Sequence, residues 1–119
     1  MGDPMRWLIA DDNEFDLRAA SAAVLRADPA ASIVEVGTGA RAIRELDAGS
    51  FDAVLTDVRM PGGVTGHDVV RVARDCGVQM IAIMTGTPGL APLGVDVIEK
   101  GPRLFQGVAD FAPPASAVA

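Results

Sequence analysis

Several residue types are scarce in this chain, and each scarcity narrows what the protein can be. The sequence has no tyrosine, one cysteine (Cys76), one histidine (His67) and one lysine (Lys100). A single cysteine cannot form a disulfide within the chain, and Cys76, which stands in a helical pattern, is expected to be a small core residue. His67 has no cysteine or second histidine at a ligand spacing, which argues against zinc. Neither disulfides nor zinc are therefore expected to hold the fold together.

Positive charge and long apolar stretches are also missing. The formal net charge is −6, and the sequence has no basic patch and no interleaved aromatic residues, so direct nucleic-acid binding is not expected. No apolar run approaches the length of a membrane span. The N-terminus lacks the cationic start and the apolar stretch of a secretory signal. We therefore expect a cytoplasmic protein that does not insert into membranes.

The composition that remains is typical of one globular domain. The chain has 119 residues, of which 50% are hydrophobic, which is enough for a core and too many for a disordered chain. We predict a single domain over residues 5–112. Residues 1–4 are expected to be a remnant of protein expression, and residues 113–119 a loose tail.

Short apolar runs alternate with helical patterns along the chain. The predicted strands cover residues 6–10, 32–36, 53–57, 80–84 and 95–99. The predicted helices run from a cap at Asp12 or Asn13 to Asp28-Pro29, from a cap at Thr38 to Gly49, and from Gly66 to Gly77. A last helix, with Pro102 in its first turn, is expected to place Leu104, Phe105, Val108 and Phe111 against the sheet. Such alternation predicts a parallel sheet with helices on both faces.

Polar residues stand at the carboxyl ends of four of these strands. Asp11 and Asp12 follow the first strand, Asp57 ends the third, Thr85 follows the fourth and Lys100 the fifth. Right-handed crossovers place these strand ends at one edge of a parallel sheet, where α/β proteins bind ligands. Each residue alone has an ordinary explanation, such as solvation, a turn or helix capping. Together they predict a site, because adjacent carboxylates repel each other unless a cation or water separates them.

This arrangement resembles the receiver domain of bacterial two-component response regulators. The residues that carry the resemblance are Asp11-Asp12 after the first strand, Asp57-x-x-Met60-Pro61 after the third, Thr85 after the fourth and Lys100 after the fifth. The similarity extends over residues 6–111. It implies a doubly wound, flavodoxin-like α/β fold with a five-stranded parallel sheet.

The resemblance also implies a function and a set of site residues. Asp57 would be phosphorylated by a partner histidine kinase or phosphotransfer protein. Mg²⁺ would be bound directly by Asp12, Asp57 and the main-chain carbonyl of Arg59, and by Asp11 through water. The domain would signal through a downstream protein partner or a homodimer, and would not be a conventional enzyme.

Elementary chemistry supports these roles. A carboxylate can accept a phosphoryl group as a nucleophile, and the transfer needs neutralisation of charge on the phosphoryl oxygens. Mg²⁺ prefers about six oxygen ligands, which clustered aspartates, a carbonyl and water supply. The ammonium of Lys100 would pair with Asp57 before phosphorylation and with the phosphoryl oxygens afterwards. The hydroxyl of Thr85 would hydrogen-bond a phosphoryl oxygen.

Four features depart from the family pattern, and three of them each concern a single residue. Val97 stands where receivers usually have an aromatic switch residue, so rotation of a ring cannot report phosphorylation here. Gly101 separates Lys100 from Pro102, whereas the family usually has a cis Lys-Pro bond; a cis Lys100–Gly101 bond is not expected. The loop from Asp57 to Gly66 is one residue longer than the common pattern.

The fourth and largest departure lies between Thr85 and Val95. The nine intervening residues include three glycines and two prolines. A parallel crossover with its helix needs at least about 10–12 residues, and both residue types oppose helices. We therefore predict that the family's fourth helix is missing or reduced to a turn. Its loss is expected to expose apolar side chains of the last two strands and to favour a dimer or a dedicated partner there. The residues concerned are Met80, Ile81, Ile83, Val95, Val97 and Ile98.

Three other classes of protein compete with this interpretation. An aspartate-nucleophile phosphatase of the haloacid dehalogenase type would need a second acid two positions after Asp57, where Arg59 stands. A flavodoxin would need a phosphate loop after the first strand, where Asp11 and Asp12 would repel the phosphate. A receiver-shaped interaction module without phosphorylation stays open, because the site residues are intact but the elements after the fourth strand are altered.

Overall fold

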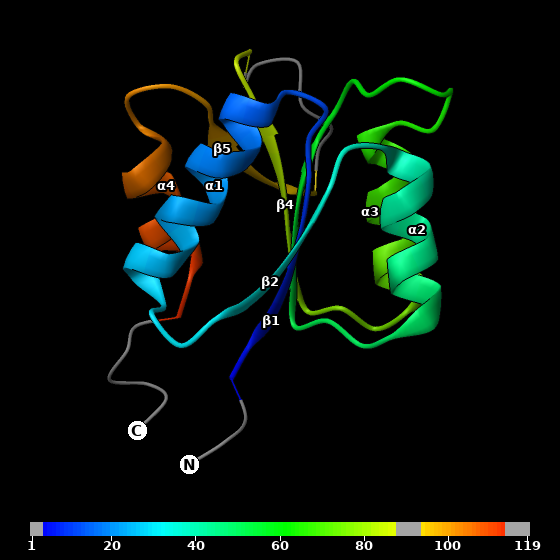
Figure 1. The fold of residues 1–119 in the computed structure, drawn as a ribbon, viewed down its shortest axis with the longest axis horizontal. Helices are drawn as coiled ribbons and strands as arrows, with labels where there is room; N and C mark the ends of the chain where they lie inside the picture. The colour runs from blue at the N-terminus through cyan, green and yellow to red at the C-terminus, as the bar shows by residue number, and fades with distance from the viewer. Residues whose placement is uncertain (1–3, 88–93, 114–119) are drawn as a thin grey trace.

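Five short strands pair side by side into one parallel sheet (Figure 1). The computed structural model describes residues 4–87 and 94–113. The strands are β1 (Arg6–Ala10), β2 (Ser32–Val36), β3 (Ala53–Asp57), β4 (Met80–Thr85) and β5 (Asp96–Glu99). They lie in the order β2-β1-β3-β4-β5, and every neighbouring pair is parallel. This is the flavodoxin-like order of a doubly wound sheet, so the predicted fold class is confirmed.

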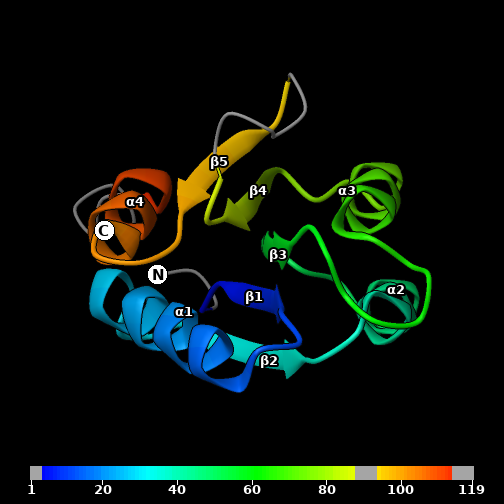
Figure 2. The ribbon, with the colours of Figure 1, turned by 90° about the horizontal axis from the view of Figure 1, so that it is seen from above.

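Helices cover both faces of the sheet. Within the described residues they are α1 (Glu14–Ala27), α2 (Gly39–Ala48), α3 (Gly66–Asp75) and α4 (Leu104–Phe111). Figures 1 and 2 show α1 and α4 on one face and α2 and α3 on the other, so the sheet is the middle of three layers. Among the described residues, no helix combines the length and apolar character needed to cross a membrane.

Two apolar cores lie between these layers. Neighbouring side chains along a strand point to opposite faces. Trp7 and Ile9 therefore join the core beneath α1 and α4, whereas Leu8 between them joins the core beneath α2 and α3. All three residues are fully buried. Strands β3 and β4 are apolar up to the threonines near their carboxyl ends, because both of their faces are covered.

Side-chain caps fix where three of the helices begin. Asn13 caps α1 by accepting a hydrogen bond from the Asp16 N–H, at 3.1 Å. Thr38 caps α2 in the same way, as the sequence predicted. Thr65 caps α3 in a capping box, in which the Asp68 carboxylate in turn accepts from the Thr65 N–H at 3.0 Å. This cap fixes the start of α3, which lies close against the end of β3.

The last helix differs from the sequence prediction in one side chain. Leu104 and Val108 are buried and Phe111 packs edge-on against Trp7, with ring centroids 5.9 Å apart, but Phe105 is 40% exposed. The side chains one turn apart form the buried stripe, and Phe105 lies about 100° around the helix from Leu104. Phe105 contacts Arg26 of α1 instead, whose guanidinium lies 5.7 Å from the ring centroid. Pro102 also precedes α4 and does not lie in its first turn.

Cys76 is exposed, so the prediction of a core cysteine is wrong. The buried stripe of α3 includes Val69 and Ala73, but the helix ends at Asp75 and Cys76 is its C-cap. Gly77 follows with a φ of 82°, which turns the chain away from the helix axis. Because the helix ends there, Cys76 lies at the surface and no longer on the buried stripe.

The connection between β4 and β5 is the segment in which the sequence predicts that the family's fourth helix is missing or reduced to a turn. Gly86, Thr87, Gly94 and Val95 are described and none of them is helical. The rest of the segment, residues 88–93, lies outside the described residues. In its described part, the connection is tied to α3 by a hydrogen bond from Arg74 Nη2 to the carbonyl oxygen of Gly94, at 2.6 Å. Strand β5 begins at Asp96, one residue later than predicted.

The expectation of a contiguous exposed apolar surface on β4 and β5 is wrong for the residues that were named. Ile83 and Ile98 are buried, Met80, Ile81 and Val95 are half-buried, and only Val97 is exposed, at 37%. Ile81 packs against the core beneath α2 and α3, and Met80 and Ile98 against the core beneath α1 and α4. A dimer or partner at this face therefore stays a prediction without an exposed patch to support it.

Candidate functional site

The carboxyl ends of the strands bring the predicted site residues to one edge of the sheet. The register pairs Ala10 with Thr56, Asp57 with Met84 and Thr85 with Glu99, so these strands end nearly level. Asp11, Asp12 and Lys100 each lie within two residues of their strand's end. Parallel topology thus collects residues that are as many as 89 positions apart in sequence, Asp11 and Lys100.

Three carboxylates form a cluster at this edge. One oxygen from each of Asp11, Asp12 and Asp57 lies within 4.8 Å of the others. Asp11 is buried, Asp57 is half-buried and Asp12 is exposed, so the cluster is closed by protein on one side and open to solvent on the other. Three anions this close repel one another, and a cation between them would remove that cost.

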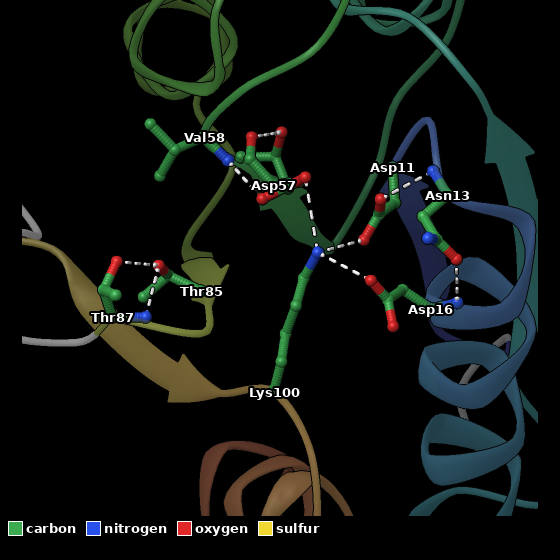
Figure 3. Close-up of polar contacts among 9 residues, drawn as sticks. Asp11, Asn13, Asp16, Asp57, Val58, Thr85, Thr87 and Lys100 are labelled. Carbon is green, nitrogen blue, oxygen red and sulfur yellow. Dashed lines mark hydrogen bonds and ion pairs between the residues drawn. The ribbon is translucent and has the colours of Figure 1, made fainter.

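The single lysine lies at the centre of the site (Figure 3). Its Nζ is 2.8 Å from Oδ2 of Asp11, 3.1 Å from Oδ2 of Asp16 and 3.3 Å from Oδ2 of Asp57. The backbone N–H of Lys100 donates to the carbonyl oxygen of Thr85 at 2.9 Å, which fixes where the side chain starts. All three contacts are ion pairs, and among them the contact to Asp16 also has the geometry of a hydrogen bond.

Asp11 and Asp57 each have one carboxylate oxygen held by the backbone. Oδ1 of Asp11 accepts from the N–H of Asn13 at 2.9 Å, and Oδ1 of Asp57 accepts from the N–H of Val58 at 2.8 Å. The other oxygen of both aspartates faces Lys100 (Figure 3). The hydroxyl of Thr56 also donates to the carbonyl oxygen of Asp57 at 2.9 Å. Both carboxylates are therefore held in place before any ligand binds.

Burial and charge shift two of the pKa values at this site. Burial raises the pKa of Asp11 above its ordinary 3.8; hydrogen bonds from Lys100 and Asn13 oppose the rise without cancelling it, and the charge of Asp57 adds to it. Burial acts to lower the pKa of Lys100, but its hydrogen bonds to Asp11 and Asp16 and the charges of Asp11 and Asp57 outweigh burial and raise it above 10.5. The ammonium therefore stays charged at neutral pH.

Thr85 is placed at the site's edge but is turned toward the next loop. Its hydroxyl accepts from the N–H of Thr87 at 3.1 Å and lies 3.3 Å from the hydroxyl of Thr87. Thr85 is 9% exposed. Figure 3 shows Thr85 and Thr87 facing each other on one side of Lys100, with Asp11 and Asp16 on the other side. The hydroxyl is thus near the site, with its hydrogen bonds directed to the β4–β5 connection.

Two residues contribute in ways that the sequence did not reveal. Asp16 lies in the first turn of α1, four residues before the buried Ala20. Residues four apart lie on the same side of a helix, so this spacing was the available signal that Asp16 lies on the covered side of α1. Gly66 opens α3 so close to β3 that a Cβ atom would lie 2.0 Å from the carbonyl oxygen of Asp57. The Gly66 N–H donates to the carbonyl oxygen of Val58 at 2.8 Å, which closes the loop between them.

Arg59 lies in that same loop, and its residue is exposed. The proposed role of its main-chain carbonyl as a metal ligand stays a prediction. Gly62 and Gly63 have φ angles of 95° and 81°, a conformation that other residues rarely adopt. The two glycines let the loop after β3 turn back toward α3.

The fold and the acid–lysine site together define a response regulator receiver, and comparison with known proteins agrees. The family model for the response regulator receiver domain matches residues 7–103. The chain therefore belongs to the response regulator receiver domain family, which places it in two-component signalling.

Relatives of several kinds share the fold. A receiver protein from Sinorhizobium medicae WSM419 is 24% identical over 92% of this chain and 94% of its own, with a TM-score of 0.73. The chemotaxis response regulator CheY4 of Vibrio cholerae is 19% identical over 90% of this chain and 94% of its own, also with a TM-score of 0.73. The receiver domain of the hybrid histidine kinase CckA is 26% identical over 85% of this chain and 90% of its own, with a TM-score of 0.66.

A curated relative matches a shorter part of the chain. Stress response regulator protein 1 of Candida tropicalis (strain ATCC MYA-3404 / T1) is 33% identical over 69 residues, which is 58% of this chain. The chain spans only 26% of the length of that relative. The shared region is therefore a module of a larger protein in that organism.

Proposed function

We propose that this receiver accepts a phosphoryl group on Asp57 in a Mg²⁺-dependent reaction. The donor would be a histidine kinase or a phosphotransfer protein. The observation that carries the proposal is the geometry around Asp57, whose carboxylate is half-buried, fixed by the Val58 N–H and 3.3 Å from the Lys100 ammonium. A carboxylate so placed is a candidate nucleophile with a cation ready to neutralise the incoming group.

The residues around Asp57 have separate tasks in the proposed reaction. An Asp57 oxygen attacks phosphorus, the bond between phosphorus and the donor nitrogen breaks, and the electron pair leaves with the donor imidazole. Lys100 stays charged and pairs with a phosphoryl oxygen, which lowers the charge that develops in the transfer. Thr85 would donate its hydroxyl to another phosphoryl oxygen after releasing Thr87.

The acidic cluster fits the proposed metal. Mg²⁺ prefers oxygen ligands, keeps several waters and often binds through only one or two carboxylates. Asp12 and Asp57, with the carbonyl of Arg59, would hold it directly and Asp11 through water; the spacing of the three carboxylates, within 4.8 Å, and the exposure of Asp12 support this assignment. When bound, Mg²⁺ would neutralise charge on the carboxylates and on the phosphoryl oxygens.

The proposed output is protein contact. The net charge of −6 supports partners other than nucleic acid. A downstream protein or a second copy of the chain is the proposed partner, and the composition supports a cytoplasmic location. Without an aromatic at Val97, the β4–β5 connection is the candidate for reporting phosphorylation, because Thr85 bonds to Thr87 within it.

Intact-protein mass spectrometry with a small phosphodonor tests the proposal. We expect a gain of one phosphoryl group that requires a divalent cation and is lost in Asp57→Asn. Asp75→Asn is the matched control, because it removes the same charge from the exposed last residue of α3. Equal labelling of Asp57→Asn would show that the acceptor lies elsewhere. No labelling of the parent protein with Mg²⁺ would favour an interaction module without phosphorylation.

A further inference from the structure

We infer that Asp16 is a positioning residue of the phosphoryl-acceptor site, holding Lys100 on the α1 side of Asp57 and restraining phosphorylation. This inference rests on the proposed function of Asp57. The observation that carries it is the pairing of one ammonium with three carboxylates at unequal distances, of which Asp57 is the farthest.

The distances show where Lys100 is held. Its Nζ lies 2.8 Å from Asp11 and 3.1 Å from Asp16, but 3.3 Å from Asp57. Asp11 and Asp16 both lie on the α1 side of the ammonium (Figure 3). The Asp16 contact meets the geometry of a hydrogen bond, at 3.1 Å. One donor proton of Lys100 is therefore directed to a residue outside the strand ends.

The backbone of Asp16 is fixed by the cap of α1. Its N–H donates to Oδ1 of the cap residue Asn13 at 3.1 Å, which anchors the first turn of α1. Among the described residues, the acidic group close enough to share a metal consists of Asp11, Asp12 and Asp57, without Asp16. The carboxylate of Asp16 is thus a partner for Lys100 and not a member of the metal cluster.

The effect of Asp16 follows from charge. A phosphoryl group carries about −1.5 to −2 charges at neutral pH and needs cations around it. Asp16 adds a negative charge to the site and keeps part of the Lys100 ammonium directed away from Asp57. Replacement by asparagine removes the charge, and Lys100 then moves toward Asp57 and the incoming phosphoryl group. We expect Asp16→Asn to be phosphorylated about two- to fivefold faster, because the side chain of Asp16 is 42% exposed and ion pairs at such positions are weak.

The first experiment compares labelling rates of three proteins with one small phosphodonor and Mg²⁺. Glu14→Gln is the matched control, because Glu14 is the other acid in the first turn of α1 but pairs with Arg18, at 2.6 Å. The expected order is a faster Asp16→Asn and an unchanged Glu14→Gln. Asp16→Glu restores the charge and should return the rate toward that of the parent. Equal acceleration of phosphorylation in Asp16→Asn and Glu14→Gln would show that the rate depends only on net charge, and would overturn the inference. A rate for Asp16→Asn that is slower than that of the parent, or unchanged, would also overturn it.

The second experiment does not depend on phosphorylation. Because Lys100 is the only lysine, protein made with ¹⁵N-labelled lysine gives one side-chain signal in the NMR spectrum. Asp16→Asn should move that signal and Glu14→Gln should leave it in place. A signal that stays in place in Asp16→Asn overturns the inference whether or not Asp57 is phosphorylated. A moved signal in a protein that accepts no phosphoryl group would refute the proposed function and the restraint, while the hold on Lys100 would stand.

Discussion

Gly66 shows how one residue without a side chain can set the geometry of a site. A Cβ atom at this position would lie 2.0 Å from the carbonyl oxygen of Asp57 and 2.9 Å from the Cα of Val58. Both neighbours are backbone atoms, so neither can rotate away. The start of α3 can therefore lie against the end of β3 only because residue 66 is glycine.

Gly66→Ala should destabilise the protein by about 1–3 kcal/mol, the usual cost of forcing extra volume into a packed region. Urea unfolding of the two proteins measures the difference. Gly37→Ala is the control, because nothing lies within 4 Å of a Cβ atom there and its φ is not positive. An alanine at position 66 that costs no more than the one at position 37 would contradict the close approach of α3 to β3.

At the scale of secondary structure, α2 and α3 offer a comparison of two caps. Thr38 accepts one N–H bond, from Arg41. The Thr65 hydroxyl accepts from the N–H of Asp68, and the Thr65 N–H donates to the Asp68 carboxylate. Loss of a threonine cap costs about 1 kcal/mol. Thr65→Ala and Thr38→Ala should therefore cost similar amounts at neutral pH, as measured by urea unfolding, but only α3 adds a contribution from a carboxylate.

The carboxylate of Asp68 makes that contribution dependent on pH. The hydrogen bond from the Thr65 N–H is the largest of the influences that lower the pKa of Asp68 below its ordinary 3.8. A group with a lowered pKa stabilises the fold above its unfolded pKa, and the stabilisation is lost as pH falls through the folded pKa. The stability difference between the parent and Asp68→Ala should thus shrink below about pH 3.8. If the difference in unfolding free energy between the two proteins stays constant from pH 6 to pH 3, the charge of the Asp68 carboxylate does not stabilise the cap.

The elements that the sequence predicted well are those decided by local patterns. A short apolar run such as the one in Arg6–Ala10 is typical of a strand that is covered on both faces of a sheet. Asn13 and Thr38 cap helices through their own side chains. The sequence could not show how far around a short helix the covered stripe extends, which is why Phe105 was placed wrongly. Nor could it show that α3 would stop one residue before Cys76.

The residues of the site also separate into those that the sequence could predict and one that it did not. Asp11, Asp57 and Lys100 converge because each lies at the end of a parallel strand, a consequence of topology that the order of the elements already implies. Asp16 joins them from a helix, and its contact depends on the angle at which α1 crosses the sheet. The sequence shows only that Asp16 lies one turn before the buried Ala20 and not the crossing angle, so it did not predict the third carboxylate on Lys100.

For the molecule as a whole, one edge of the sheet concentrates negative charge. Asp11, Asp12 and Asp57 lie together there, and Lys100 offsets only part of their repulsion. A ligand that binds only the folded chain stabilises it by RT ln(1 + [L]/Kd), about 2.7 kcal/mol at a concentration 100 times Kd. Mg²⁺ alone should therefore raise the melting temperature of the protein.

Asp12→Ala should remove the response to Mg²⁺ and, without Mg²⁺, melt no lower than the parent because one repulsive charge is gone. Thermal melts with and without millimolar Mg²⁺ measure both effects. Asp75→Asn is again the control and should keep the response of the parent. Melting temperatures of the parent that are the same with and without Mg²⁺ would argue against a metal site at this edge.

The exposed Cys76 has a practical consequence for these measurements. Helix α3 begins at Gly66 beside Asp57 and ends just before Cys76, and ten helical residues span about 15 Å. The chain thus offers one thiol at a known distance from the site and one lysine amine inside it. A fluorophore can be attached near the far end of α3 without any engineered cysteine, and labelling by an amine-reactive reagent, read at Lys100 apart from the N-terminal amine, would measure how open Lys100 is to solvent.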